Sequence, residues 1–159
     1  MTDAIPTAAP DRTGAEIELL SFVVGGQDYC VDIMSVREIR GGARATPLPH
    51  APPYMRGVIN LRGTVLPIMD LAARLDLGHE AETGRNVIIV VAIGGRTMGL
   101  VVDAVSDILS VAGQALQTPP DLPADNARSF VSALTIVEER MIRVLDLTAL
   151  LPPAGEAAA

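Results

Sequence analysis

Apolar and polar residues alternate along most of this chain in short runs, and glycine or proline separates one run from the next. Short runs with this alternation, rich in Val and Ile, are typical of β-strands. The pattern predicts strands at 16–24, 29–33, 57–61, 64–69, 86–93, 98–102, 130–137 and 140–145. Short helices are expected at 35–40, 71–77 and 146–151, and a turn or short helix at 105–111. The fold class is therefore predicted to be all-β with short helices.

The stretch 54–71, YMRGVINLRGTVLPIMDL, predicts the hairpin around which the rest is organised. Gly63 is the second central residue of a two-residue turn and allows the positive φ that such a turn needs. Arg62 is then expected at the exposed tip. Pro67 donates no backbone hydrogen bond, which predicts that the second strand lies at a sheet edge or contains a bulge.

The chain also contains an internal repeat. The pattern from Gly25 to Ile39 matches the pattern from Gly94 to Ile108 without a gap, at an offset of 69 (94 − 25). The hairpin with Asp70 recurs as a last hairpin with Asp146, at an offset of 76 (146 − 70). We predict one domain over 16–151, built from two similar halves that each form a small five-stranded β-barrel and share a core.

Composition narrows the function. The net charge of −7 and 3% aromatic content disfavour nucleic-acid binding, and every one of the basic residues is arginine, which excludes catalytic or phosphate-binding lysines. The longest apolar run, 87–93, is far shorter than the roughly 20 residues of a membrane helix. We expect a soluble, cytoplasmic protein, with disordered tails at 1–15 and 152–159. Five arginines and one acid between Arg37 and Arg62 predict one electropositive face.

Candidate catalytic groups are weak. The serines lie in no nucleophile elbow, and His50, His79 and the single Cys30 make a poor zinc site. The acid pairs, Asp28 with Asp32 and Asp103 with Asp107, each cross from a strand into the next element, so their carboxylates need not converge. The sequence predicts no enzyme activity, no metal and no cofactor.

Several motifs together resemble the CheW family of chemotaxis coupling proteins. These are YCVDIMSVREIR, YMRGVINLRGTVLPIMDL and MGLVVDAVSDIL, in family order, and the resemblance covers about 16–151. It implies two five-stranded β-barrels and a non-enzymatic scaffold that links chemoreceptors to the histidine kinase CheA. The chain lacks room for the extra domains of CheA or CheV, so a free-standing adaptor, recruited to membrane-associated receptor arrays, is expected.

The resemblance also suggests two binding surfaces. Kinase binding is expected at Arg56, Gly57, Val58 and Arg62. Receptor binding is expected at Val36, Glu38, Ile39, Arg62, Gly99, Val105 and Ile108, in a groove between the barrels that suits a receptor helix. We further predict that Glu38 and Arg62 form an ion pair that fixes the angle of the hairpin.

Each assignment has a structural alternative. Gly57 can serve only a tight backbone, Val58, Ile39 and Ile108 can be core residues, and Glu38 and Arg62 can be separately solvated charges. At the level of function, the alternatives to a scaffold are a small-ligand-binding barrel, which would need polar groups inside, and an enzyme. Binding to receptor fragments and CheA would separate the scaffold from both.

Overall fold

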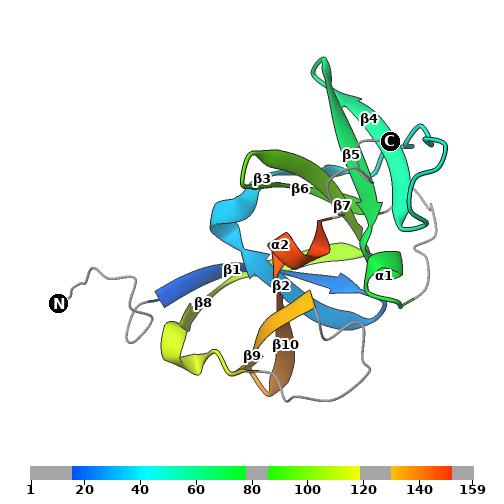
Figure 1. Ribbon diagram of the computed structural model, residues 1–159. Coiled ribbons are helices and arrows are strands. Elements are labelled where there is room, and N and C mark those ends of the chain that lie inside the picture. Colours follow the sequence, from blue (N-terminus) through cyan, green and yellow to red (C-terminus); the bar gives the residue numbers. More distant parts are fainter. Residues whose placement is uncertain (1–15, 78–85, 119–129, 152–159) are drawn as a thin grey trace.

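A computed structural model describes residues 16–77, 86–118 and 130–151. In these ranges the chain forms two five-stranded sheets, which lie one above the other in Figure 1. Sheet A has the order β8-β1-β2-β10-β9 and sheet B the order β3-β6-β7-β5-β4. The strands are β1 (Glu16–Val24), β2 (Gln27–Asp32), β3 (Val36–Gly41), β4 (Met55–Leu61), β5 (Thr64–Asp70), β6 (Val87–Ile93), β7 (Arg96–Val102), β8 (Ala104–Ala112), β9 (Val131–Val137) and β10 (Arg140–Leu145). Short helices are η1 (Ile33–Ser35), α1 (Leu71–Arg74), η2 (Gly113–Ala115) and α2 (Leu147–Leu150).

The two halves of the repeat exchange strands. β8, from the second half, pairs with β1, and β3, from the first half, pairs with β6. The all-β fold class with short helices and two five-stranded sheets is confirmed, but neither sheet consists of one half of the chain. Nor do the described ladders close the sheets into full barrels. Instead, one isolated bridge in each sheet links the segment after one edge strand to the opposite edge strand. In sheet B the bridge joins Thr46, after β3, to Val58 of β4. In sheet A it joins Gln117, after β8, to Leu134 of β9.

The segments 36–40 and 105–111 are strands, and only Ser35 belongs to a helix, η1. The predictions of a helical turn at 35–40 and of a turn or short helix at 105–111 were therefore wrong. β3 alternates between half-buried and exposed residues along its length, as an edge strand with one covered face does. A bulge between Val36 and Glu38 sits in this strand. Charged residues on an exposed edge strand gave the segment the composition of an amphipathic helix.

Pro67 does not mark an edge strand, because β5 lies between β4 and β7. The parallel ladder with β7 begins at Ile68, one residue later, so Pro67 occupies a position where the ladder needs no N–H from it. The two α-helices are also shorter than expected at four residues each, although Asp70 and Asp146 cap them as the pattern predicts. The expected tails at 1–15 and 152–159 and the loop residue His79 lie outside the described residues.

The largest cluster of buried apolar residues lies between the two sheets. It joins Phe22 and Tyr29 of sheet A to Met69, Ile89 and Leu100 of sheet B. Each sheet also encloses a smaller cluster of its own. The single cysteine, Cys30, is buried in the cluster of sheet A, and this burial raises the pKa of its thiol to about 12. Cys30 is therefore a core residue.

Two-residue turns connect all the hairpins in the described ranges. The turn residues Gly25-Gly26, Arg62-Gly63, Gly94-Gly95 and Glu138-Glu139 all have positive φ. This conformation matches the twist of the flanking strands and favours glycine. Glu138 and Glu139 adopt this conformation although neither is glycine, with φ of 52° and 67°.

Replacing Glu139 with Gly is expected to stabilise the protein. A left-handed conformation costs a non-glycine residue about 1–2 kcal/mol, and the extra freedom of glycine in the unfolded chain takes back about 0.5–1 kcal/mol. The net gain of about 0.5–1 kcal/mol corresponds to a Tm increase of about 1–4 °C in a calorimetric scan. Glu139→Gln is the control, because it removes the charge and keeps the backbone cost. An equal rise in Tm for both variants would mean that charge, and not backbone conformation, is responsible.

Candidate functional site

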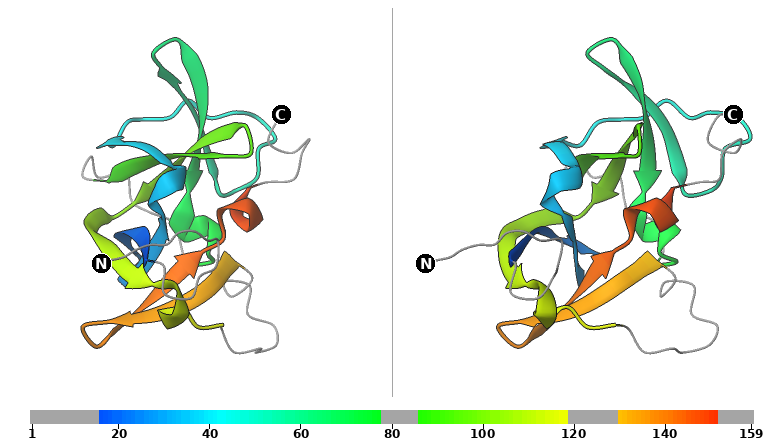
Figure 2. Two further views of the ribbon diagram at one scale, coloured as in Figure 1. Left: turned by 90° about the vertical axis from the view of Figure 1, so that its left-hand side faces the viewer. Right: turned by 60° about the vertical axis from the view of Figure 1, so that its left-hand side comes forward.

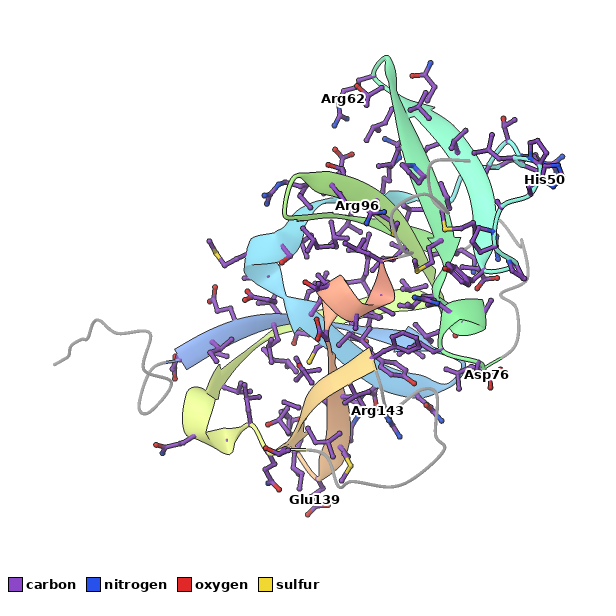
Figure 3. The ribbon with its side chains drawn as sticks, viewed as in Figure 1. His50, Arg62, Asp76, Arg96, Glu139 and Arg143 are labelled. Carbon is purple, nitrogen blue, oxygen red and sulfur yellow. The ribbon has the colours of Figure 1, made fainter. Side chains whose placement is uncertain are left out.

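The β4–β5 hairpin projects from sheet B and carries Arg62 at its tip (Figures 1 and 3). An Arg62 nitrogen donates to Oε1 of Glu38 at 2.5 Å, and Oε2 of Glu38 lies 3.6 Å from an Arg40 nitrogen. The predicted Glu38–Arg62 ion pair is thus confirmed. It connects the hairpin tip to β3, the opposite edge of the same sheet. We call Glu38, Arg40 and Arg62 the hairpin face.

The two charges shift each other's titration. The hydrogen bond from Arg62, together with the positive charges of Arg62 and Arg40, lowers the pKa of Glu38. The same hydrogen bond and the charge of Glu38 raise the pKa of Arg62. The Arg62 side chain is 69% exposed and that of Glu38 29%, so the pair lies in solvent and is worth more as geometry than as stability.

Other arginines of the electropositive stretch have partners within the protein. Arg37 donates to the carbonyl oxygen of Met34 at 3.1 Å. The side chain of Arg56 is only 14% exposed and lies 3.5 Å from the buried carboxylate of Asp70. Arg56 therefore has a structural partner, which the sequence did not reveal and which disfavours its expected role at an exposed kinase surface.

Gly57 is a backbone requirement. Its φ is 136°, and a Cβ atom there would lie 2.0 Å from the carbonyl oxygen of Thr46. That oxygen accepts from the N–H of Val58 in the bridge between the sheet edges. Val58 is half-buried. A change at Gly57 would break this bridge, so Gly57→Asp would not separate a lost binding contact from a lost fold.

The expected receptor residues fall into three groups. Ile39 on β3 and Ile108 on β8 are 45% and 53% exposed, so the core alternative is wrong for both. Val36 and Val105, which are repeat equivalents, both pack against the central core. Gly99 is buried, and a Cβ there would lie 2.7 Å from Ile68, so it cannot line a surface groove. The set therefore contains exposed, half-buried and buried members, and the groove between the halves stays a prediction.

One cluster was not found from the sequence. The guanidinium of Arg74, on α1, lies 4.2 Å from the ring centroid of Tyr54 and 4.8 Å from that of Phe130, and it donates to the carbonyl oxygen of Leu150. Tyr54 and Phe130 are repeat equivalents (130 − 54 = 76). Arg74 therefore joins equivalent points of the two halves. The sequence signal for this cluster was the aromatic residue that precedes the β4–β5 hairpin and recurs before the β9–β10 hairpin. Met34, 77% exposed, and Val65, 68% exposed, were also missed.

Within the described ranges no group of three or more His, Cys, Asp or Glu side chains is placed to hold a metal ion. No helix among the described residues is long and apolar enough to cross a membrane.

The family model of the CheW-like domain matches residues 18–154. The chain belongs to the CheW family. Chemotaxis protein CheW of Rhizobium meliloti is 49% identical over 152 residues, which cover 96% of this chain and 98% of the relative. Probable chemotaxis protein CheW of Rhizobium etli is 51% identical over 133 residues, which cover 84% and 86%. The crystal structure of the scaffolding protein TtCheW from Thermoanaerobacter tengcongensis matches with a TM-score of 0.79 at 27% identity, over 94% of this chain and 96% of that one.

As a CheW family member the chain has the role of an adaptor in chemotaxis signalling. The structure shows exposed apolar residues on β3 and β8 and an arginine paired at a hairpin tip. The hairpin face and the exposed isoleucines of β3 and β8 are accordingly the candidate contacts of this adaptor.

The Glu38 carboxyl is expected to titrate below its ordinary pKa of 4.5. A lowered pKa means that the ion pair is present above the ordinary value and is lost as the pH falls through the value in the folded protein. Carbon NMR of the Glu38 carboxyl from pH 2 to 7 measures it directly. Arg62→Gln should move the midpoint back towards 4.5, and Arg140→Gln, which breaks an ion pair with Asp28 elsewhere, should not. An unchanged midpoint in Arg62→Gln would show that the pair does not form in solution.

Proposed function

We propose that this CheW family protein couples chemoreceptors to the histidine kinase CheA without catalysing a reaction itself. It would be recruited to membrane-associated receptor arrays through these contacts. The observation that carries the proposal is the Glu38–Arg62 pair, which links a projecting hairpin to the edge strand β3. A charged projection of this kind suits a protein partner, since it offers directional polar contacts.

The kinase would bind at the hairpin face. Arg62, of which 69% of the side chain is exposed, is available there, and Val65 adds an exposed apolar contact on β5. Arg56 and Gly57 would support this surface from within, because both are committed to contacts inside the protein. Val58 is half-buried and lies on the same strand.

The receptor would bind along the exposed edges of β3 and β8. Ile39, Ile108 and Met34 present apolar side chains there, and an apolar helix face could cover such side chains. Val36 and Val105 would hold these strands against the central core, and Gly99 would allow close packing of Ile68 and Ile88 within sheet B. Glu38 and Arg62 belong to the hairpin face, and their pair would set its position relative to the receptor surface on β3.

A charge exchange between Glu38 and Arg62 tests the proposal. Glu38→Arg and Arg62→Glu each place like charges together and should lower receptor-dependent kinase activation, while Tm changes little because the pair is exposed. The double variant restores opposite charges and should recover part of the activation. Reconstituted CheA autophosphorylation with receptor fragments measures this.

The exposed pair of Arg140 and Asp28, at the other end of the molecule, supplies a matched control. The exchange of Arg140 and Asp28 should leave activation unchanged. If the Glu38–Arg62 double variant equals the sum of its two single losses, the residues act independently and the hairpin angle is not what the partners recognise.

A further inference from the structure

The two sheets of this protein open into cavities of different chemistry at equivalent places. One cavity, of about 460 Å³, opens in sheet A, and one of about 150 Å³ opens in sheet B. The repeat relates their linings: Ile17, Leu19 and Asp32 of the larger cavity correspond to Asn86, Ile88 and Val101 of the smaller one, at the offset of 69. The lining residues of the larger cavity can therefore be compared one by one with their equivalents in the smaller cavity.

The hairpins that border the two cavities share even their irregularities. In β4 the residue between Met55 and Gly57 is bulged out of register. In β9, Val144 pairs with Ala133 and Leu145 pairs with Val131, so the residue between them is bulged in the same way. A bulge redirects one side chain. That side chain belongs to Arg56 in sheet B and to Ser132 in sheet A, 76 residues apart, and each lines its cavity.

In sheet B the bulged arginine neutralises the acid that caps the following helix. Arg56 lies 3.5 Å from Asp70, whose N–H in turn donates to the carbonyl oxygen of Tyr54. In sheet A the equivalent acid is Asp146, and its N–H donates to the carbonyl oxygen of Phe130 in the same arrangement. The difference is that Ser132 stands in the place of the arginine and donates to the carbonyl oxygen of Val144 instead.

The larger cavity is therefore lined by two exposed carboxylates, with no described cation beside them. Asp146 and Asp32 both line it, and their oxygens accept backbone N–H groups of η1 and α2. Neither forms an ion pair with any residue of the chain that the structure describes, and no described basic residue lines the cavity. The floor is apolar, with Leu19 and Val144.

A buried hydroxyl lies near this cavity. The Oγ1 atom of Thr135 is buried and has no hydrogen-bond partner among the described residues. Thr135 lies two residues from Ala133 in β9, so both side chains point to the same side of the strand. Ala133 lines the cavity and Thr135 does not, so this hydroxyl belongs to the neighbouring core and is not a contact of the cavity.

We propose that this cavity is a docking site for an arginine side chain of a partner protein, flanked by apolar residues. The partner would supply from outside the guanidinium that Arg56 supplies within sheet B. A guanidinium suits two carboxylates because it presents several donors in one plane, and its methylene stem suits the apolar floor. The site is separate from the hairpin face and does not depend on the CheA and receptor assignments.

Two capped tripeptides, Leu-Arg-Leu and Leu-citrulline-Leu, test the site by methyl NMR of the full chain. Citrulline has the shape of arginine without its charge. The arginine peptide should shift the methyl signals of Ala133, Val144 and Leu147 saturably, and those of Ile88 and Val101 should stay unchanged. The citrulline peptide, and the arginine peptide with Asp32→Asn/Asp146→Asn, should bind at least about tenfold more weakly. Asparagine caps a helix as well as aspartate, so the double variant removes charge and keeps the caps.

Ser132→Arg provides an independent test that needs no ligand. An arginine at the bulge should occupy the cavity as Arg56 does, raise Tm by about 2 °C or more and abolish binding of the arginine peptide. Asp146→Asn should cancel the gain in Tm, and Ser110→Arg, on the exposed part of β8, should give none. Equal shifts from both peptides, no shift from either, or a Tm of Ser132→Arg no higher than that of Ser110→Arg would overturn the proposal.

Discussion

The apolar cluster shared by the two sheets is the interaction on which the rest of this structure depends. Because β3 and β8 each pair with a strand of the other half, neither half completes a sheet without the other. The cluster from Phe22 and Tyr29 to Met69 and Leu100 then fixes the two sheets as one body. Arg74, between the rings of Tyr54 and Phe130, adds a polar contact at equivalent points of both halves. An adaptor needs this rigidity, since it holds partners at a defined separation.

Differences between the repeated halves give the molecule distinct surfaces on a symmetric frame. The hairpin tip of sheet B carries Arg62, and the equivalent tip of sheet A carries Glu138 and Glu139 (Figure 3). The two tips lie at opposite ends of the protein in every view (Figures 1 and 2). The bulged positions differ in the same manner, with Arg56 in one hairpin and Ser132 in the other. The fold is conserved between the halves and the charge is not, so each end can meet a different partner.

Local signals predicted the hairpins well, and long-range pairing set their arrangement. Gly25-Gly26, Gly63 and Gly94-Gly95 mark tight turns by their own conformational freedom, so strands on either side of them were placed correctly. The edge strands β3 and β8 were mistaken for helical turns because their exposed faces carry charged and polar residues. The exchange of these strands leaves no local pattern, since each pairs with residues more than 40 positions away.

The candidate site was predictable where charge alone decided it. Glu38 is the one acid among the arginines of 37–62, and its pairing with Arg62 followed from that. The inward direction of Arg56 depends on a bulge, and the burial of Gly99 depends on packing against Ile68, neither of which a one-dimensional pattern contains. The exposure of Ile39 and Ile108 likewise follows from their place on edge strands.

We propose that this rigid body holds two different proteins at separate faces. Size-exclusion chromatography with light scattering, on the full chain mixed with the CheA regulatory domain and a chemoreceptor cytoplasmic fragment, measures whether both bind at once. We expect a single species whose mass is that of all three components together. If each partner displaces the other, so that only two-component species are found at saturating concentrations, the two faces are not separate and the proposal is wrong.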